Sequence, residues 1–301
     1  MRCGLVLLVG AALAPIVLAA QGEPIRDWRA FRSSVELTSI TATVLDGEGR
    51  LVTDLPLDAF EVYEDGELQR VTHFTRDRVP ISLGVLLDIS DSMFGRRIAD
   101  ARVAVERFLT GLIEPADEFS ILAFNHAPRL VTGWTRGRAE VHEMLEGLRP
   151  SGGTAAYDAI VAALPLFEAR GNQRAALLLI SDGADTASDA AARDVRSALA
   201  RTDAFAYAIA IDPPDSRAIN TRVNPAALRE VTDATGGHTE VVHSSGDLVV
   251  AIARIAEELN SQYLLGYTSP RGADGRYHSI RVRIRGGGHR VRARSGYVAR
   301  P

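Results

Sequence analysis

The chain of 301 residues is long enough for one large domain with additions, or for two modest domains. Hydrophobic residues make up 46% of it and charged residues 24%, which is typical of a globular protein. The formal net charge is -4, whereas nucleic-acid-binding proteins are typically strongly basic. We therefore expect no nucleic-acid partner.

The first residues have the pattern of a signal peptide. Arg2 precedes an apolar run over residues 5–18, which is shorter than the roughly 20 residues of a membrane-spanning helix. Small residues follow, so we predict a signal peptide over 1–20 with cleavage near Ala20; an uncleaved anchor is the alternative. The only cysteine, Cys3, lies inside this segment. We therefore expect an exported protein, periplasmic or extracellular, with no disulfide and no later membrane span.

The next part of the chain reads as β-structure. Apolar and polar residues alternate with period two over 35–44, and the pattern returns over 60–63 and 71–74. Asp65-Gly66 lies between the last two stretches and predicts a hairpin that joins them.

After this β-region the pattern changes to alternating strands and helices. Residues 81–87 and 175–180 are almost continuously apolar, which is typical of strands buried on both faces of a parallel sheet. The other expected strands are 119–124, 129–132, 204–211 and 238–242, and the expected helices are 96–112, 140–148, 155–170, 190–200, 225–232 and 248–259. This alternation predicts an α/β fold with a doubly wound, mostly parallel sheet and helices on both faces.

A β-pattern returns in the last part of the chain, over 263–267, 278–284 and 291–297. Neither flank is large enough for a good core, so we expect the two to pack together, or against the sheet edge, as one small β-subdomain. The predicted organisation is a signal peptide at 1–20, an N-terminal β-segment at 33–78, a central domain at 79–260 and a C-terminal β-segment at 261–299.

Three short polar sequences lie at strand ends or before a helix of the central domain. They are Asp88-Ile89-Ser90-Asp91-Ser92, Ser151-Gly152-Gly153-Thr154 and Ser181-Asp182-Gly183. In a doubly wound sheet, the loops at the carboxyl ends of strands near the switch point form the ligand crevice, so we expect the three to meet there. Their carboxylates and hydroxyls are oxygen ligands of the kind that a hard divalent cation prefers.

The spacing of the first sequence suits a metal site. Alternate residues on an extended loop point the same way, so Asp88, Ser90 and Ser92 are expected to face one point. Gly152 and Gly153 let the backbone pass close to the ion. Five side chains fill part of the shell of about six oxygens that Mg²⁺ requires, which leaves one position open at the surface. The predicted metal ligands are Asp88, Ser90, Ser92, Thr154 and Asp182, and the expected cation is Mg²⁺, with Mn²⁺ or Ca²⁺ as alternatives.

The order Asp-x-Ser-x-Ser, then Thr, then Asp resembles the metal-ion-dependent adhesion site of von Willebrand factor A domains and integrin inserted domains. The resemblance implies that Ser90, Ser92 and Thr154 ligate the metal. It also implies that Asp88 and Asp182 act directly or through water, and that the open position binds a carboxylate of a partner protein. Asp91 departs from the pattern, because the family has a small residue there; its charge could strengthen cation binding or change the partner preference.

The flanks resemble those of a subfamily of exported bacterial proteins with this domain. The similarity lies in residues 62–66 and 72–74 before the motif, and in 263–267 and 291–297 after it. It extends the resemblance to residues 33–298 and supports the domain layout, but says little about function.

Further residues are candidates for the rim of the site. They are Asp91, Gly153, Asn125 and Asp185, although Asp185 could instead cap the helix that follows it. Histidines elsewhere have no metal-ligand or catalytic-triad spacing, so we expect them to be solvated or hydrogen-bonded; they are His126, His238 and His243.

The combined hypothesis is an exported, cation-dependent module of the adhesion type that binds an Asp or Glu of a partner protein and is not an enzyme. One alternative is a structural component of a cell-envelope assembly, whose metal only stabilises a loop. The other is a metal-dependent hydrolase in which Asp88 and Asp182 hold the metal, although the sequence offers it no clear general base.

Overall fold

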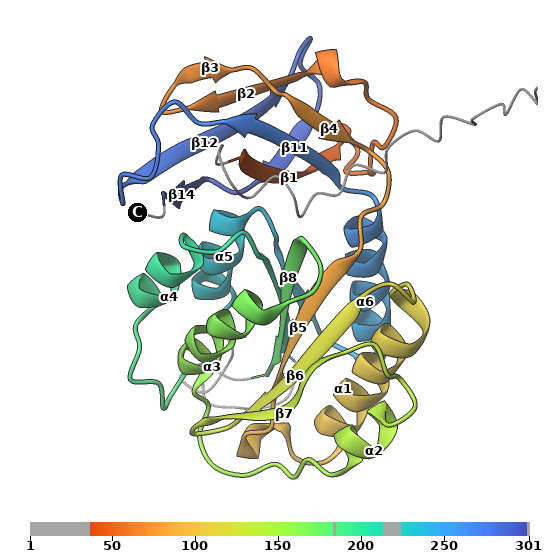
Figure 1. Cartoon of the computed structure of the whole chain (residues 1–301). Helices are drawn as coiled ribbons and strands as arrows, with labels where there is room; N and C mark the ends of the chain where they lie inside the picture. The colour runs from red at the N-terminus through yellow and green to blue at the C-terminus, as the bar shows by residue number, and fades with distance from the viewer. Residues whose placement is uncertain (1–36, 183–184, 213–223, 300–301) are drawn as a thin grey trace, which may run out of the picture. The chain divides into compact units, whose positions relative to one another are not determined.

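A computed structural model describes residues 37–182, 185–212 and 224–299, so the predicted signal peptide at 1–20 lies outside the described residues. The described residues fall in one compact unit. They form a six-stranded sheet with helices and two four-stranded antiparallel sheets (Figure 1). None of the helices in these three ranges combines the length and the apolar character needed to cross a membrane.

The central sheet has the strand order β10-β9-β8-β5-β6-β7. Its strands are β5 (Ile81–Asp88), β6 (Glu118–Phe124), β7 (Pro128–Thr135), β8 (Arg174–Ser181), β9 (Phe205–Ile211) and β10 (Thr239–Val242). Only β7 runs antiparallel to its neighbour among these strands. β5 and β8 are buried at every position, as their apolar sequences predict. The expected doubly wound, mostly parallel sheet is confirmed.

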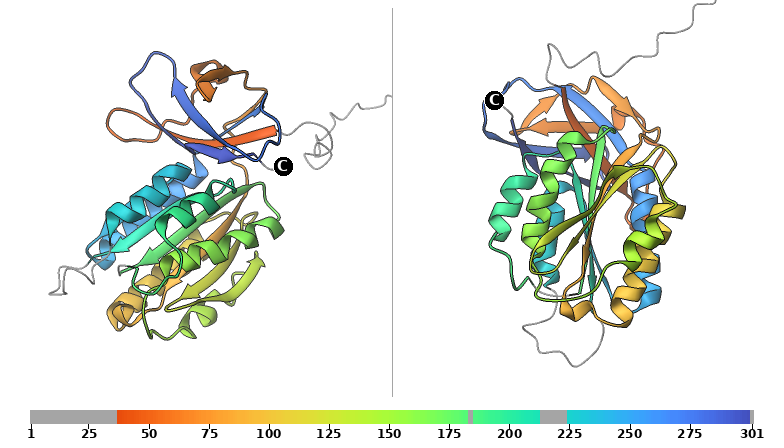
Figure 2. Two further views of the ribbon diagram at one scale, coloured as in Figure 1. Left: turned by 90° about the vertical axis from the view of Figure 1, so that its left-hand side faces the viewer. Right: turned by 60° about the horizontal axis from the view of Figure 1, so that its bottom comes forward.

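Helices cover both faces of this sheet (Figure 2). One face carries α1 (Arg96–Arg107), α2 (Val141–Glu146) and α6 (Ser245–Asn260), and the other carries α3 (Ala156–Ala163), α4 (Ala192–Leu199) and α5 (Pro225–Thr235). Successive strand residues point to opposite faces, so Val85 of β5 joins the first core and Leu86 joins the second.

Two of the expected helices change type before they end. The stretch 96–112 is α1 followed by a π-helical turn, η4 (Phe108–Leu112). The stretch 155–170 is α3 followed by a 3-10 helix, η5 (Leu164–Ala169). Pro165 lies at the start of η5, where its missing N–H and its ring prevent α3 from continuing unchanged.

The two flanks of the chain mix in both antiparallel sheets, which have the orders β13-β1-β11-β4 and β14-β12-β2-β3. Their strands are β1 (Leu37–Leu45), β2 (Phe60–Glu64), β3 (Glu67–Gln69), β4 (His73–Thr75), β11 (Tyr263–Thr268), β12 (Tyr277–Ile284), β13 (Arg290–Ala293) and β14 (Gly296–Val298). A 3-10 turn, η2 (Leu57–Ala59), precedes β2. Ile40 and Val62 from one flank share a core with Tyr267 and Val282 from the other. The flanks therefore pack together, as expected.

Two predictions for these strands are wrong in their pairing. Asp65-Gly66 does form a turn, and both residues have positive φ, but the turn joins β2 to β3 rather than to 71–74. β4 pairs with β11 instead. The expected strand 291–297 is divided into β13 and β14, which belong to different sheets. The N–H of Ser295, between them, donates to a carbonyl of α5, a long-range contact that local periodicity does not reveal.

A buried carboxylate connects the flanking strands with the central domain. Glu258 of α6 accepts hydrogen bonds from the hydroxyls of Thr43 and Tyr207, each at 3.0 Å. Its other oxygen forms an ion pair with Arg292 of β13. Glu258 is only 2% exposed. A buried charge is costly unless it is paired and hydrogen-bonded, so these partners stabilise one another at this junction.

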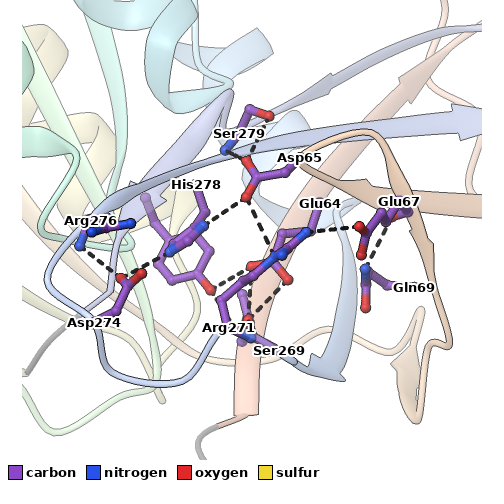
Figure 3. Close-up of polar contacts among 12 residues, drawn as sticks. Glu64, Asp65, Glu67, Gln69, Ser269, Arg271, Asp274, Arg276, His278 and Ser279 are labelled. Carbon is purple, nitrogen blue, oxygen red and sulfur yellow. Dashed lines mark hydrogen bonds and ion pairs between the residues drawn. The ribbon is translucent and has the colours of Figure 1, made fainter.

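A second polar cluster fixes the loop between β11 and β12 to the turn after β2 (Figure 3). The ring nitrogens of buried His278 lie 2.8 Å from an oxygen of Asp65 and 3.0 Å from an oxygen of Asp274. The hydrogen bond with Asp65 is the main cause that raises the pKa of His278. The same contact lowers the pKa of Asp65. The pKa of Asp274 is lowered first by the N–H of Arg276 and then by His278.

The first prediction concerns Glu258. Its replacement by alanine should destabilise the protein by about 3–5 kcal/mol, because Arg292 is left buried without its carboxylate. Urea denaturation measures this change in the free energy of unfolding. The control is Glu257→Ala, which changes the exposed neighbour on the same helix and should cost less than about 0.5 kcal/mol. Equal losses in the two variants would contradict the importance of the junction.

The second prediction concerns His278 and pH. Folding raises its pKa above the unfolded value of about 6.5, so its stabilising effect is complete below that pH and is lost as pH rises through the raised pKa. The lowered pKa values of Asp65 and Asp274 act at the acid end, where stabilisation is lost as pH falls through them. The melting temperature of the wild type should therefore exceed that of His278→Gln most at about pH 5–6. A difference that stays constant up to about pH 9 would refute this linkage.

Candidate metal centre

The candidate site lies where the winding of the central sheet reverses. From β5 the chain builds β6 and β7 on one side, and then β8, β9 and β10 on the other. The helices that follow β5 and β8 lie on opposite faces, which is the arrangement that places ligand sites of doubly wound sheets at the carboxyl ends of such strands. Leu87 pairs with Ile180, so Asp88 and Asp182 follow at neighbouring strand ends.

Side-chain contacts bring the two strand-end loops together. The Ser92 hydroxyl donates to Asp182 Oδ1 at 2.6 Å and lies 2.9 Å from the Ser90 hydroxyl. Asp88 Oδ1 accepts the backbone N–H of Ser90 at 2.7 Å, and its Oδ2 accepts the Ser181 hydroxyl at 2.5 Å. Four of the five predicted ligand residues are thus connected by these contacts.

Thr154, the fifth predicted ligand, lies in a loop that is hydrogen-bonded to both strand-end loops, the one after β5 and the one after β8. The N–H of Asp91 donates to the carbonyl of Gly152 at 2.9 Å. The carbonyl of Thr154 accepts the N–H of Thr186 at 2.9 Å. Thr154 is itself buried. The backbone therefore joins the three loops into one surface at the edge of the sheet.

The two glycines of this loop permit close approach to neighbouring side chains. Gly152 has a φ of +75°, where a residue with a Cβ is strained, and a Cβ there would lie 2.9 Å from Nδ1 of His126. A Cβ on Gly153 would lie 3.1 Å from the Cβ of Ala187. The expectation that these glycines let the backbone pass close to an ion stays a prediction. Gly183, the glycine of the third sequence, lies outside the described residues.

Burial makes the negative charge of the site unfavourable without a cation. Asp88 and Asp182 are both buried. Burial is the largest cause that raises the pKa of Asp88, to about 6, and the charge of Asp182 raises it further; hydrogen bonds from Ser181 and Ser90 oppose the rise. A bound cation would favour the charged carboxylate and so reverse this effect.

The chemistry of the donor set fits a hard divalent cation. All donors are oxygens, from two carboxylates and three hydroxyls. Over the part of the chain that the structure describes, no group of three or more His, Cys, Asp or Glu side chains is placed to hold a metal. A cation here would therefore depend on hydroxyl and water oxygens beside Asp88 and Asp182, which agrees with the way Mg²⁺ retains several waters in proteins.

The candidate rim residues lie around these loops, with one correction. Asp91 is exposed in a 3-10 turn, η3 (Asp91–Met93), in the loop that follows β5. The side-chain amide of Asn125 donates to the Ser151 hydroxyl at 3.1 Å. Asp185 accepts the N–H of Tyr157 at 2.9 Å and so caps α3. The expected cap of the following helix is therefore wrong, because a long-range loop contact directs this carboxylate to an earlier helix.

Sequence reasoning missed Arg97 as a residue of the site. Its Nε lies 3.3 Å from Asp182 Oδ2, and its Nη1 donates to the backbone carbonyl of Ser92 at 2.8 Å. Arg97 stands in the first turn of α1, which contains no acidic residue and where the helix dipole disfavours a cation. Arg96 shares this unfavourable position but pairs with Asp100 of its own helix, so no local signal in the sequence singles out Arg97.

A hollow of about 440 Å³ opens beside Arg97. Phe94, Ile211 and Leu248 supply apolar walls, and Arg97 and His243 add basic groups. Phe94 is 76% exposed, which is unusual for so large an apolar side chain. The edge of the sheet thus combines a polar, oxygen-rich site with an adjoining apolar depression.

Comparison with known proteins agrees with this architecture. Residues 83–184 match the family model of the von Willebrand factor type A domain, a range that contains all five predicted ligands. The inter-alpha-trypsin inhibitor heavy chain H4 of Bos taurus is 31% identical over 163 residues, which are 48% of this chain and 17% of that protein. The chain therefore spans less than a fifth of the length of this curated relative.

Two solved structures share the fold. A von Willebrand factor type A protein from Catenulispora acidiphila has a TM-score of 0.53 at 15% identity, over 89% of this chain and 75% of that one. The conserved hypothetical protein BatB from Bacteroides thetaiotaomicron has a TM-score of 0.50 at 21% identity, over 60% of this chain and 97% of that one. Residues 83–184 are thus similar in sequence to the von Willebrand factor type A domain, and the sheet order agrees with the fold of these structures.

Proposed function

We propose that this chain is an exported module that binds a divalent cation and, through it, a carboxylate of a partner protein. The observation that carries the proposal is the meeting of two buried carboxylates with serine hydroxyls at the switch point of the sheet. Mg²⁺ is the proposed cation, and Mn²⁺ and Ca²⁺ are alternatives. The proposed ligands are Asp88, Ser90, Ser92, Thr154 and Asp182.

An open coordination position supports partner binding. Five side chains, some of them acting through water, do not complete an octahedral shell of about six oxygens. Ser92 is half-buried and Asp91 is exposed, so the site reaches the surface. A carboxylate oxygen is a favourable ligand for a hard cation, and the resemblance of the motif to adhesion sites points to an Asp or Glu side chain of a protein. The adjoining hollow offers space for residues beside it.

We propose no catalytic activity, because the sequence offers no histidine with catalytic-triad or metal-ligand spacing. One ring nitrogen of two histidines has a neighbour: His238 Nε2 lies 3.1 Å from Glu240, and His243 Nδ1 lies 2.6 Å from the carbonyl of Asp212. The exported location rests on the predicted signal peptide at 1–20.

The third prediction concerns metal binding. Addition of Mg²⁺ to the EDTA-treated protein should raise the melting temperature, since a ligand at 100 times its Kd adds about 2.7 kcal/mol to the stability of the folded state. Asp88→Asn should abolish the shift. In EDTA this variant should be no less stable than the wild type, because it keeps the side-chain shape and removes a buried carboxylate.

The matched control for this experiment is Asp91→Asn, which changes an exposed carboxylate of the same loop. Its affinity for Mg²⁺, measured by calorimetry, should fall by no more than a few-fold, since the charge is solvated. Absence of any metal shift in the wild type would refute the metal site. An equal shift in Asp88→Asn would place the ion elsewhere.

The fourth prediction concerns the partner. Peptides selected from a random display library in Mg²⁺ should share an Asp or Glu and should be released by EDTA. Replacing that residue with Asn or Gln should weaken binding about tenfold or more, which corresponds to about 1.4 kcal/mol. A protein that binds Mg²⁺ but selects no acidic peptide would favour the alternative in which the metal only stabilises a loop.

A further inference from the structure

We infer that Arg97 is a built-in cation that neutralises Asp182 when no metal is bound, and that it thereby lowers the affinity of the site for divalent ions. The inference rests on the proposed cation site and concerns its regulation. It assigns a role to a residue outside the five proposed ligands.

Arg97 is fixed to two residues of the proposed ligand set. Its Nε lies 3.3 Å from the Asp182 carboxylate, and its Nη1 donates to the Ser92 carbonyl at 2.8 Å. The Arg97 side chain is 21% exposed, and that of Asp182 is fully buried. Charges at this distance interact more strongly near the protein interior than in water, so the guanidinium supplies positive charge where Asp88 and Asp182 would otherwise repel.

Arg96, the preceding residue, shows that this placement is specific to Arg97. Both arginines stand at the start of α1, against the helix dipole. The Arg96 side chain is 84% exposed and pairs with Asp100 on its own helix at 3.4 Å. Arg97 instead turns toward the strand ends. The contrast shows that Arg97, unlike Arg96, lies against the strand-end loops, where it contacts the Asp182 carboxylate and the Ser92 carbonyl.

Both oxygens of Asp182 already have partners in the described arrangement. Oδ1 accepts the Ser92 hydroxyl at 2.6 Å, and Oδ2 faces Arg97. A cation that uses Asp182, directly or through water, must either share this carboxylate with the guanidinium or displace it. Both routes oppose metal binding, since two positive charges are brought close together or an ion pair is broken. The site is thus tuned to fill only at higher concentrations of the ion.

The opposite role for Arg97 is that it orients Asp182 for the metal, in which case its loss would weaken binding. The two roles differ in the sign of one measurement. Calorimetry with Mg²⁺ and with Mn²⁺ on the full chain, together with melting temperatures in EDTA, tests Arg97→Gln, Arg97→Lys and the control Arg96→Gln.

The expected results follow from charge. Arg97→Gln should bind the ion about tenfold more tightly or better, yet melt at a lower temperature than the wild type in EDTA. Arg97→Lys keeps the charge and should stay within a few-fold of the wild type in affinity. Arg96→Gln should change neither quantity. If Arg97→Gln is unfolded in EDTA, its recovery on addition of Mg²⁺ replaces the melting comparison.

The outcomes separate this inference from the proposed function. Wild-type binding together with equal or weaker binding by Arg97→Gln overturns the inference and leaves the metal site intact. Binding by Arg97→Gln alone supports the inference, because the arginine then excludes the ion by itself, but it refutes the proposed cation binding by the wild-type chain. No binding by either protein refutes the proposed metal site. An unchanged melting temperature of Arg97→Gln in EDTA refutes the neutralising role on its own.

Discussion

Two carboxylates, Asp88 and Asp182, are buried at the carboxyl ends of adjacent parallel strands, and the proposed cation site is arranged around this constraint. The parallel register of β5 and β8 brings them to neighbouring positions. Burial raises the pKa of Asp88, and hydrogen bonds from Ser181 and Ser90 oppose this rise. Hydroxyls of Ser90 and Ser92 and the guanidinium of Arg97 surround the two groups. A hard cation would complete this balance of charge.

Two buried carboxylates that each face an arginine have different roles because they lie in different places in the fold, one structural and one in the proposed cation site. Glu258 also faces an arginine and accepts two hydroxyl hydrogen bonds, but it lies where a helix meets strands of both flanks, and its partners fix that junction. Asp182 faces Arg97 at a strand end, beside a second carboxylate and near an apolar hollow. Groups of similar chemistry therefore hold the fold together in one place and supply the proposed binding surface in the other.

Local sequence signals failed where pairing partners lie far apart in the chain. Residues 291–297 alternate like one strand, but the chain changes sheets near Ser295, where the backbone bonds to α5. Asp185 reads as a cap for the next helix and instead caps α3. In both cases the competing partner lies many residues away, so periodicity and nearest-neighbour rules do not contain it. Asp65-Gly66 is different, because the strand that its turn serves, β3, follows at once, with Glu64 paired to Glu67.

The sequence by itself determined the α/β class, the doubly wound sheet and the oxygen donors. Apolar runs and strand-end motifs are local properties of the chain, so they can be read without knowing which distant residues pack together. It also placed Asp88 and Asp182 at strand ends that the switch point brings together. Only the tertiary structure decided that the flanks share two sheets and that Arg97 lies against Asp182. Those features depend on contacts between residues far apart in the chain. Packing sets these contacts, and the spacing of residues in the sequence does not reveal them.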